Sequence, residues 1–131
     1  MAVSIDAKLI YMNDVNTAAT VNGNVIDLGG NGVLASPMFC TVKLTKGLSA
    51  GTIAKVTVQS SANESFSSPV EEMSVTVGAS VDQTKPCNLA QFFFPLEVHN
   101  RYTRVVVTGG GTAPSGGKLW AYLSPDFQAP V

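Results

Sequence analysis

The chain has 131 residues, the size of a single domain. Its formal net charge is −1 and its eight basic residues are scattered, which excludes a basic surface of the kind that attracts DNA or an anionic membrane. Charged residues make up only 13% of the chain, about half of their usual share in a soluble domain. Either Ser, Thr, Asn and Gly supply the surface polarity, or another molecule covers part of the surface.

Signals for secretion, membrane insertion and disulfide formation are weak in this sequence. Residues 1–6 have no basic segment followed by an apolar run, so we expect no signal peptide. No apolar stretch is long enough to cross a membrane, and we expect synthesis in the cytoplasm. Cys40 and Cys87 do not form a CxxC motif, and we expect two free, buried thiols. A disulfide between them is the alternative, which their spacing in the sequence does not decide.

Short runs of alternating apolar and polar residues recur along the chain, separated by Gly, Asn, Pro and Ser. Because side chains in a strand alternate between two faces, each run predicts a strand with one core-facing side. In chain order we expect strands at residues 8–12, 24–29, 37–46, 52–60, 72–78, 91–97, 101–109 and 118–124. Many short strands with regular turns predict a β-sandwich, and eight strands are typical of a jelly roll. The expected fold is therefore all-β: one sandwich domain over residues 1–131, with short terminal arms.

Two of the expected strands are apolar on both faces. In 91–97, Phe93 lies between two further phenylalanines, and in 118–124, Trp120 and Tyr122 face away from an apolar side. Only one face of each sheet in a sandwich is core, so a loop or a partner molecule must cover the other face. We predict that four residues lie at or near contacts with a partner: Phe93, Arg104, Trp120 and Tyr122. Arg104, in 101–109, either pairs with a partner carboxylate or lies at a solvated edge.

Catalytic and metal-binding patterns are weak throughout. His99 is the sole histidine and falls in an expected surface turn, without a nucleophile and an acid close in sequence. The glycine-rich segment 109–117 fails as a phosphate loop because Gly117 stands where the lysine should be, and we expect a flexible hairpin loop instead. No catalytic residue, cofactor or metal site is predicted, and the chain is not expected to be an enzyme.

Several segments, taken in order, resemble one protein family. They are Asn-Val-Ile-Asp-Leu-Gly at 24–29, Val-Thr-Val-Gln-Ser-Ser-Ala-Asn-Glu-Ser-Phe-Ser-Ser at 56–68, Phe-Pro-Leu at 94–96, Arg-Tyr-Thr-Arg-Val at 101–105, Gly-Gly-Lys at 116–118 and Ala-Tyr-Leu at 121–123. Together they resemble the capsid cement, or decoration, proteins of short-tailed and related phages. The glycine-rich segment 109–117 and the three consecutive phenylalanines depart from that resemblance.

The resemblance implies a jelly roll without catalytic activity, made in the host cytoplasm and mounted on the exterior of the virion capsid. It implies binding to the major capsid protein and to itself, as a dimer or trimer, with no nucleic-acid or membrane partner. A carbohydrate- or receptor-binding module of a virion is the alternative, since Trp120, Tyr122 and Tyr102 would stack on sugar rings if exposed.

Overall fold

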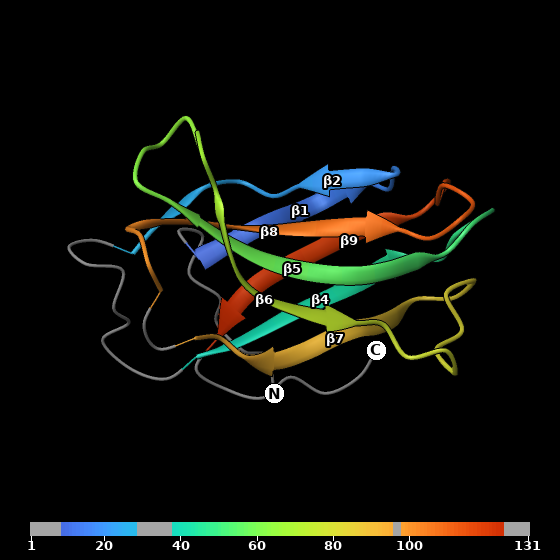
Figure 1. The fold of residues 1–131 in the computed structure, drawn as a ribbon. Helices are drawn as coiled ribbons and strands as arrows, with labels where there is room; N and C mark the ends of the chain where they lie inside the picture. Colours follow the sequence, from blue (N-terminus) through green and yellow to red (C-terminus); the bar gives the residue numbers. More distant parts are fainter. Residues whose placement is uncertain (1–8, 29–37, 96–97, 125–131) are drawn as a thin grey trace.

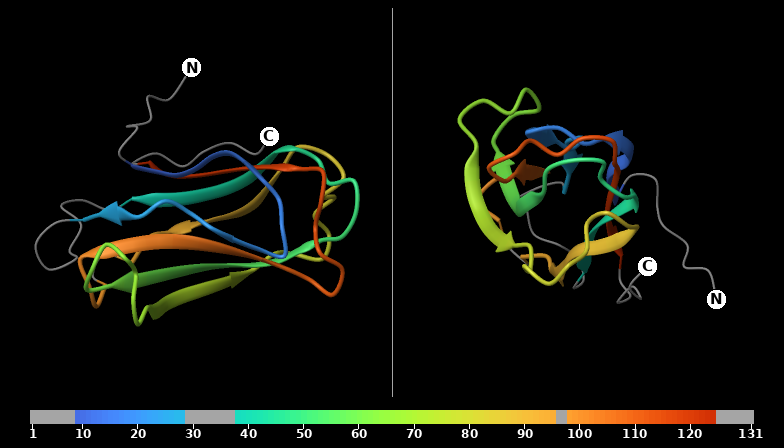
Figure 2. Two further views of the ribbon diagram at one scale, coloured as in Figure 1. Left: turned by 90° about the horizontal axis from the view of Figure 1, so that it is seen from above. Right: turned by 90° about the vertical axis from the view of Figure 1, so that its right-hand side faces the viewer.

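The computed structural model describes residues 9–28, 38–95 and 98–124 of the chain. Within these ranges the chain forms nine strands, all but β3 labelled in Figure 1: β1 (Ile10–Asn16), β2 (Thr20–Asn22), β3 (Ile26–Asp27), β4 (Phe39–Lys46), β5 (Ile53–Ser61), β6 (Val70–Thr76), β7 (Cys87–Phe93), β8 (Tyr102–Gly109) and β9 (Lys118–Ser124). They make two antiparallel sheets that pack face to face as two layers (Figure 2). The first sheet has the order β1-β9-β4-β7, and the second has the order β2-β8-β5-β6, with β3 also paired to β8.

The predicted all-β sandwich is confirmed, but the predicted count of eight strands is wrong. The additional strand is β2, and the predicted strand at 24–29 shortens to β3. Both short strands pair with β8, which places Val21 opposite Val107 and Ile26 opposite Thr103. Segments of two or three residues are too short to show alternation, so their strand conformation comes from this pairing with β8.

β7 differs most from its predicted bounds, because it starts at Cys87 and ends at Phe93. A register shift in the β4–β7 pairing allows Leu89 and Ala90 both to enter the core, which breaks the alternation. β7 ends two residues before Pro95, which has no N–H to donate to a sheet. Residues 8, 29, 37, 96 and 97 of the predicted strands, and the predicted terminal arms, lie outside the described residues.

The core lies between the two sheets and is built from the alternating positions that the sequence indicated. Each fully buried Val or Leu in it contributes roughly 1.5–3 kcal/mol relative to an exposed side chain. Cys40 is buried within this core, whereas Cys87 is half-buried and both thiols are free. The most deeply buried side chains from the four central strands are Cys40, Val42 and Leu44 of β4, Val56 and Val58 of β5, Val105 and Val107 of β8, and Leu119, Ala121 and Leu123 of β9.

One buried polar chain joins the two sheets across this core. Tyr11 Oη of β1 lies 2.7 Å from Thr103 Oγ1 of β8, and the Thr103 hydroxyl donates to the Ile26 carbonyl at 3.1 Å. Since the Thr103 proton is used on Ile26, the Tyr11 hydroxyl must donate to Thr103. Burial raises the pKa of Tyr11, so this phenol stays protonated and remains a donor.

The glycine-rich segment 109–117 is not a hairpin loop, because it joins β8 in the second sheet to β9 in the first. It packs against the loop between β4 and β5, where Ala50 and Ser115 form an isolated antiparallel bridge. Gly51 in that loop has a φ of 72°, and a Cβ there would lie 2.4 Å from the Ala113 carbonyl oxygen. Glycine is therefore required for the close approach of the two loops, which close one end of the sandwich.

Candidate interaction surface

Three of the four predicted contact residues lie on one surface, the outer face of the first sheet. The register pairs Phe93 with Phe39, and Thr41 with Tyr122, while Lys43 pairs with Trp120. Paired residues in antiparallel strands share a face, so all of these side chains point away from the core. We call this surface the outer face of the first sheet.

Phe93 provides the most exposed large apolar side chain of the described residues, with 64% of its surface accessible. It stacks on Phe39, with the two ring centroids 4.4 Å apart and the planes inclined by 29°. Its neighbours in sequence behave differently: Phe94 is buried and stacks against Tyr11, and Phe92 packs against the core. An exposed phenylalanine at the end of an edge strand indicates a contact that the isolated chain does not make.

In the middle of this face, Lys43 lies between β9 and β7. Its Nζ atom is 4.8 Å from the ring centroid of Trp120 and 5.6 Å from that of Tyr122. Burial lowers the pKa of Lys43. On its two flanks, Trp120 Nε1 and Asn88 Oδ1 are both buried and have no hydrogen-bond partner. No pattern in the sequence predicted this row of Trp120, Lys43 and Asn88, because the row depends on the cross-strand register.

Tyr122 faces outward but is only 1% exposed, so it offers little surface to a partner in the isolated chain. Its ring lies against Trp120, with centroids 5.1 Å apart. Burial raises the pKa of Tyr122, and a hydrogen bond with Thr41 acts in the opposite direction. The side chain of Gln91 also donates to Thr41, at 3.1 Å.

Arg104 lies apart from the other three predicted contact residues, on the outer face of the second sheet. Its Nε donates to Gln59 Oε1 at 3.0 Å, and its guanidinium lies 4.4 Å from the Phe66 ring centroid. Phe66 has a φ of 56°, in the left-handed region that a phenylalanine rarely adopts. The contacts of Arg104 therefore hold the loop between β5 and β6 against β8.

A serine, a glutamate and a histidine also meet, but not in the order of a catalytic triad. Ser60 Oγ donates to Glu72 Oε2 at 2.5 Å, and His99 Nδ1 lies 2.9 Å from Glu72 Oε1. Among the hydrogen bonds of the described residues, none joins His99 to Ser60, so the histidine cannot take the serine proton. This cluster joins β6 to the turn between β7 and β8.

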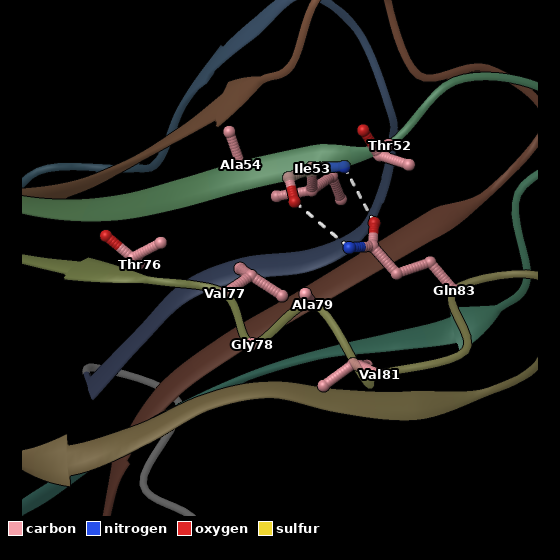
Figure 3. A pocket seen from close by; sticks show the side chains of 9 residues that line it. All are labelled: Thr52, Ile53, Ala54, Thr76, Val77, Gly78, Ala79, Val81 and Gln83. Atoms are coloured by element: carbon pink, nitrogen blue, oxygen red, sulfur yellow. Dashed lines mark hydrogen bonds between the residues drawn. The ribbon is translucent and has the colours of Figure 1, made fainter.

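A shallow depression of about 290 Å³ lies where β5 begins and β6 ends (Figure 3). Gln83 reaches across it, accepting from the Ile53 N–H at 2.7 Å and donating to the Ile53 carbonyl at 3.0 Å. None of the described residues that line it has an ionisable side chain. The depression is therefore a gap beneath a loop, and the described side chains that line it supply no ionisable group for acid–base chemistry.

Metal ligands and membrane spans are not found in the part of the chain that the structure describes. Across residues 9–28, 38–95 and 98–124, no three His, Cys, Asp or Glu side chains gather as a metal site. The same ranges contain no helix able to cross a membrane. No family model matches the chain, and no curated protein matches it either.

Proposed function

We propose that this protein is a non-enzymatic cement protein of a tailed-phage capsid, bound to the capsid exterior across contacts between major capsid proteins. The observation that carries the proposal is the exposed Phe93, which stacks on Phe39. It lies on the same outer face as the row of Trp120, Lys43 and Asn88. Large apolar side chains exposed on one face are typical of protein–protein contacts, and a protein that acts by covering another protein requires such a face. The resemblance in the sequence supplies the identity of the partner.

Two further features support this proposal. Most strands that follow each other in the sequence lie in opposite sheets, as β3 and β4, β4 and β5, and β6 to β9 do, and this alternation supports the proposal of a jelly roll. The serine, glutamate and histidine at Ser60, Glu72 and His99 are arranged as a structural cluster, which favours a role in binding over one in catalysis.

The copy number of the protein in purified virions tests the proposal. Quantitative mass spectrometry should find about one copy per major capsid protein or a fixed simple fraction of it, as expected for a protein that covers a symmetric lattice. A handful of copies per virion, or none, would overturn the proposal.

Truncation of the exposed ring tests whether this face makes the contact. Phe93→Ala should reduce binding to capsids that lack the protein, because exposed aromatic anchors carry much of an interface's binding energy. The matched control is Val25→Ala, which shortens the other large exposed apolar side chain among the described residues, one that lies between β2 and β3. Equal binding by both variants and the unaltered chain would place the contact elsewhere.

The alternative, a carbohydrate- or receptor-binding module, has less support from this geometry. Sugars stack on open aromatic faces, but the Lys43 ammonium lies over the rings of Trp120 and Tyr122. Tyr102 lies on the other sheet, next to the Arg101 guanidinium, whose carbon is 5.1 Å from its ring centroid. A glycan array with specific binding that Trp120→Ala abolishes would favour this alternative.

A further inference from the structure

The outer face of the first sheet changes from aromatic to basic along its length. Phe39 and Phe93 pair at one end of β4 and β7, while Lys46 lies at the other end of β4, opposite Lys118 of β9. β4 has eight residues, so its two ends are roughly 23 Å apart at the rise of an extended strand. The face therefore has two chemically distinct ends that one partner can contact together.

The basic end places two like charges side by side. Lys46 and Lys118 are direct cross-strand partners, an arrangement that destabilises a sheet. Neither takes part in an ion pair with another described residue. Lys43 lies on the same face, and two acids lie near its basic end: Asp14, which accepts a hydrogen bond from Thr45 at 3.3 Å, and Asp82, which forms an ion pair with Lys85 at 3.8 Å. Among the described residues on and beside this end of the face, lysines therefore outnumber acids by four to two, on a chain whose formal net charge is −1.

The middle of the face carries a second unmet requirement. Trp120 Nε1 and Asn88 Oδ1, on either side of Lys43, are the two buried side-chain polar atoms without a hydrogen-bond partner in the described residues. Such atoms are rare in folded proteins and destabilise the chain that contains them. Both atoms lie on this face, and among the described residues none lies on the outer face of the second sheet. The face that exposes Phe93 is therefore also the face with unsatisfied hydrogen-bonding groups.

From these features we infer that the outer face of the first sheet docks on an acidic protein surface. Carboxylates of the partner face Lys46 and Lys118, and apolar side chains of the partner cover the exposed Phe93, roughly 20 Å away. The inference rests on the proposed function and specifies the chemistry of the capsid surface that is bound. A protein is favoured over nucleic acid because three lysines are few for a phosphate backbone, and two phenyl rings gain nothing from phosphates.

Charge reversal tests this inference with a built-in check on folding. Lys46→Glu with Lys118→Glu should weaken binding to capsids lacking the protein by about tenfold or more, because two attractions become repulsions. The double variant keeps a like-charge pair at the same cross-strand position, so its thermal unfolding should match that of the unaltered chain. The control is Lys55→Glu with Thr76→Glu, a cross-strand pair of exposed residues on the second sheet, which makes the net charge more negative by three units where the test variant does so by four. It should change binding by roughly twofold or less.

Three outcomes separate this inference from the proposed function. If the unaltered chain binds these capsids, and raising the salt from about 50 mM to about 300 mM weakens binding, the inference is supported together with the variant results. If the unaltered chain binds, but neither the higher salt nor either double variant weakens binding by more than about twofold, the acidic partner surface is wrong and the cement role stands. If it does not bind capsids at all, or binds a short DNA duplex equally well, both proposals are overturned.

Discussion

The hydrogen-bonded chain from Tyr11 through Thr103 to Ile26 predicts how the free energy of unfolding changes in two single variants and in the variant that combines them. Tyr11→Phe removes one donor, but the Thr103 hydroxyl still donates to the Ile26 carbonyl. We expect a loss of about 0.5–1.5 kcal/mol in the free energy of unfolding, the net value of one buried hydrogen bond.

Thr103→Val should cost more, although it removes only one oxygen. The change leaves the buried Tyr11 hydroxyl without a partner and also removes the side-chain hydrogen bond to the Ile26 carbonyl. One unsatisfied buried hydroxyl costs roughly 1–3 kcal/mol and the lost hydrogen bond roughly 0.5–1.5 kcal/mol, so the expected loss is about 1.5–4.5 kcal/mol. The valine has nearly the same shape as the threonine, so little of this loss comes from packing.

The double variant gives the decisive comparison. Adding Tyr11→Phe to Thr103→Val removes the phenol that has lost its partner, so the double variant should be more stable than Thr103→Val alone. Urea unfolding of the four proteins, with equal m-values, measures this coupling. If the two losses simply add, or if Tyr11→Phe costs more than Thr103→Val, then the two side chains do not share the bond described here.

Three further changes are tested by the same unfolding measurement. Burial alone would raise the pKa of Glu72, but the hydrogen bonds from Ser60 and His99 outweigh burial and lower this pKa. Stability from Glu72 is therefore present above its unfolded pKa and declines as the pH falls below about 4.5. Glu72→Gln should flatten that decline, and an unchanged slope would contradict it. Lys46→Glu alone should add about 0.2–1 kcal/mol by pairing with Lys118, an effect that high salt should remove. Trp120→Phe should change stability by no more than about 1 kcal/mol, because deleting an unpartnered N–H offsets the contacts with Lys43 and Tyr122 that the smaller ring weakens; a loss of several kcal/mol would contradict this offset.

Alternation predicted the strands that carry the core, because burial on one face imposes a period of two on the sequence. Residues 118–124 form β9 with the predicted bounds, and the outward positions of Trp120 and Tyr122 follow directly from the buried Leu119 and Leu123. Where a bulge interrupts the period, as at Leu89, the prediction of β7 was displaced.

Contacts between strands could not be predicted, because they depend on register and on which sheet each strand joins. Nothing local in the sequence places Lys43 between Trp120 and Asn88, or Lys46 opposite Lys118. The same limit explains why Arg104 was grouped with residues that lie on the opposite sheet. Both facts follow from pairings of residues far apart in the chain.

The side chain of Gln83 has a consequence for how these chains behave when crowded. β6 ends at Thr76, and beyond it the backbone of Ile53 would present one N–H and one C=O at an open sheet margin. The Gln83 amide binds both groups and so imitates one residue of a neighbouring strand. An unrelated chain cannot extend the sheet at this position unless it first displaces that amide, so Gln83 blocks strand addition at the start of β5.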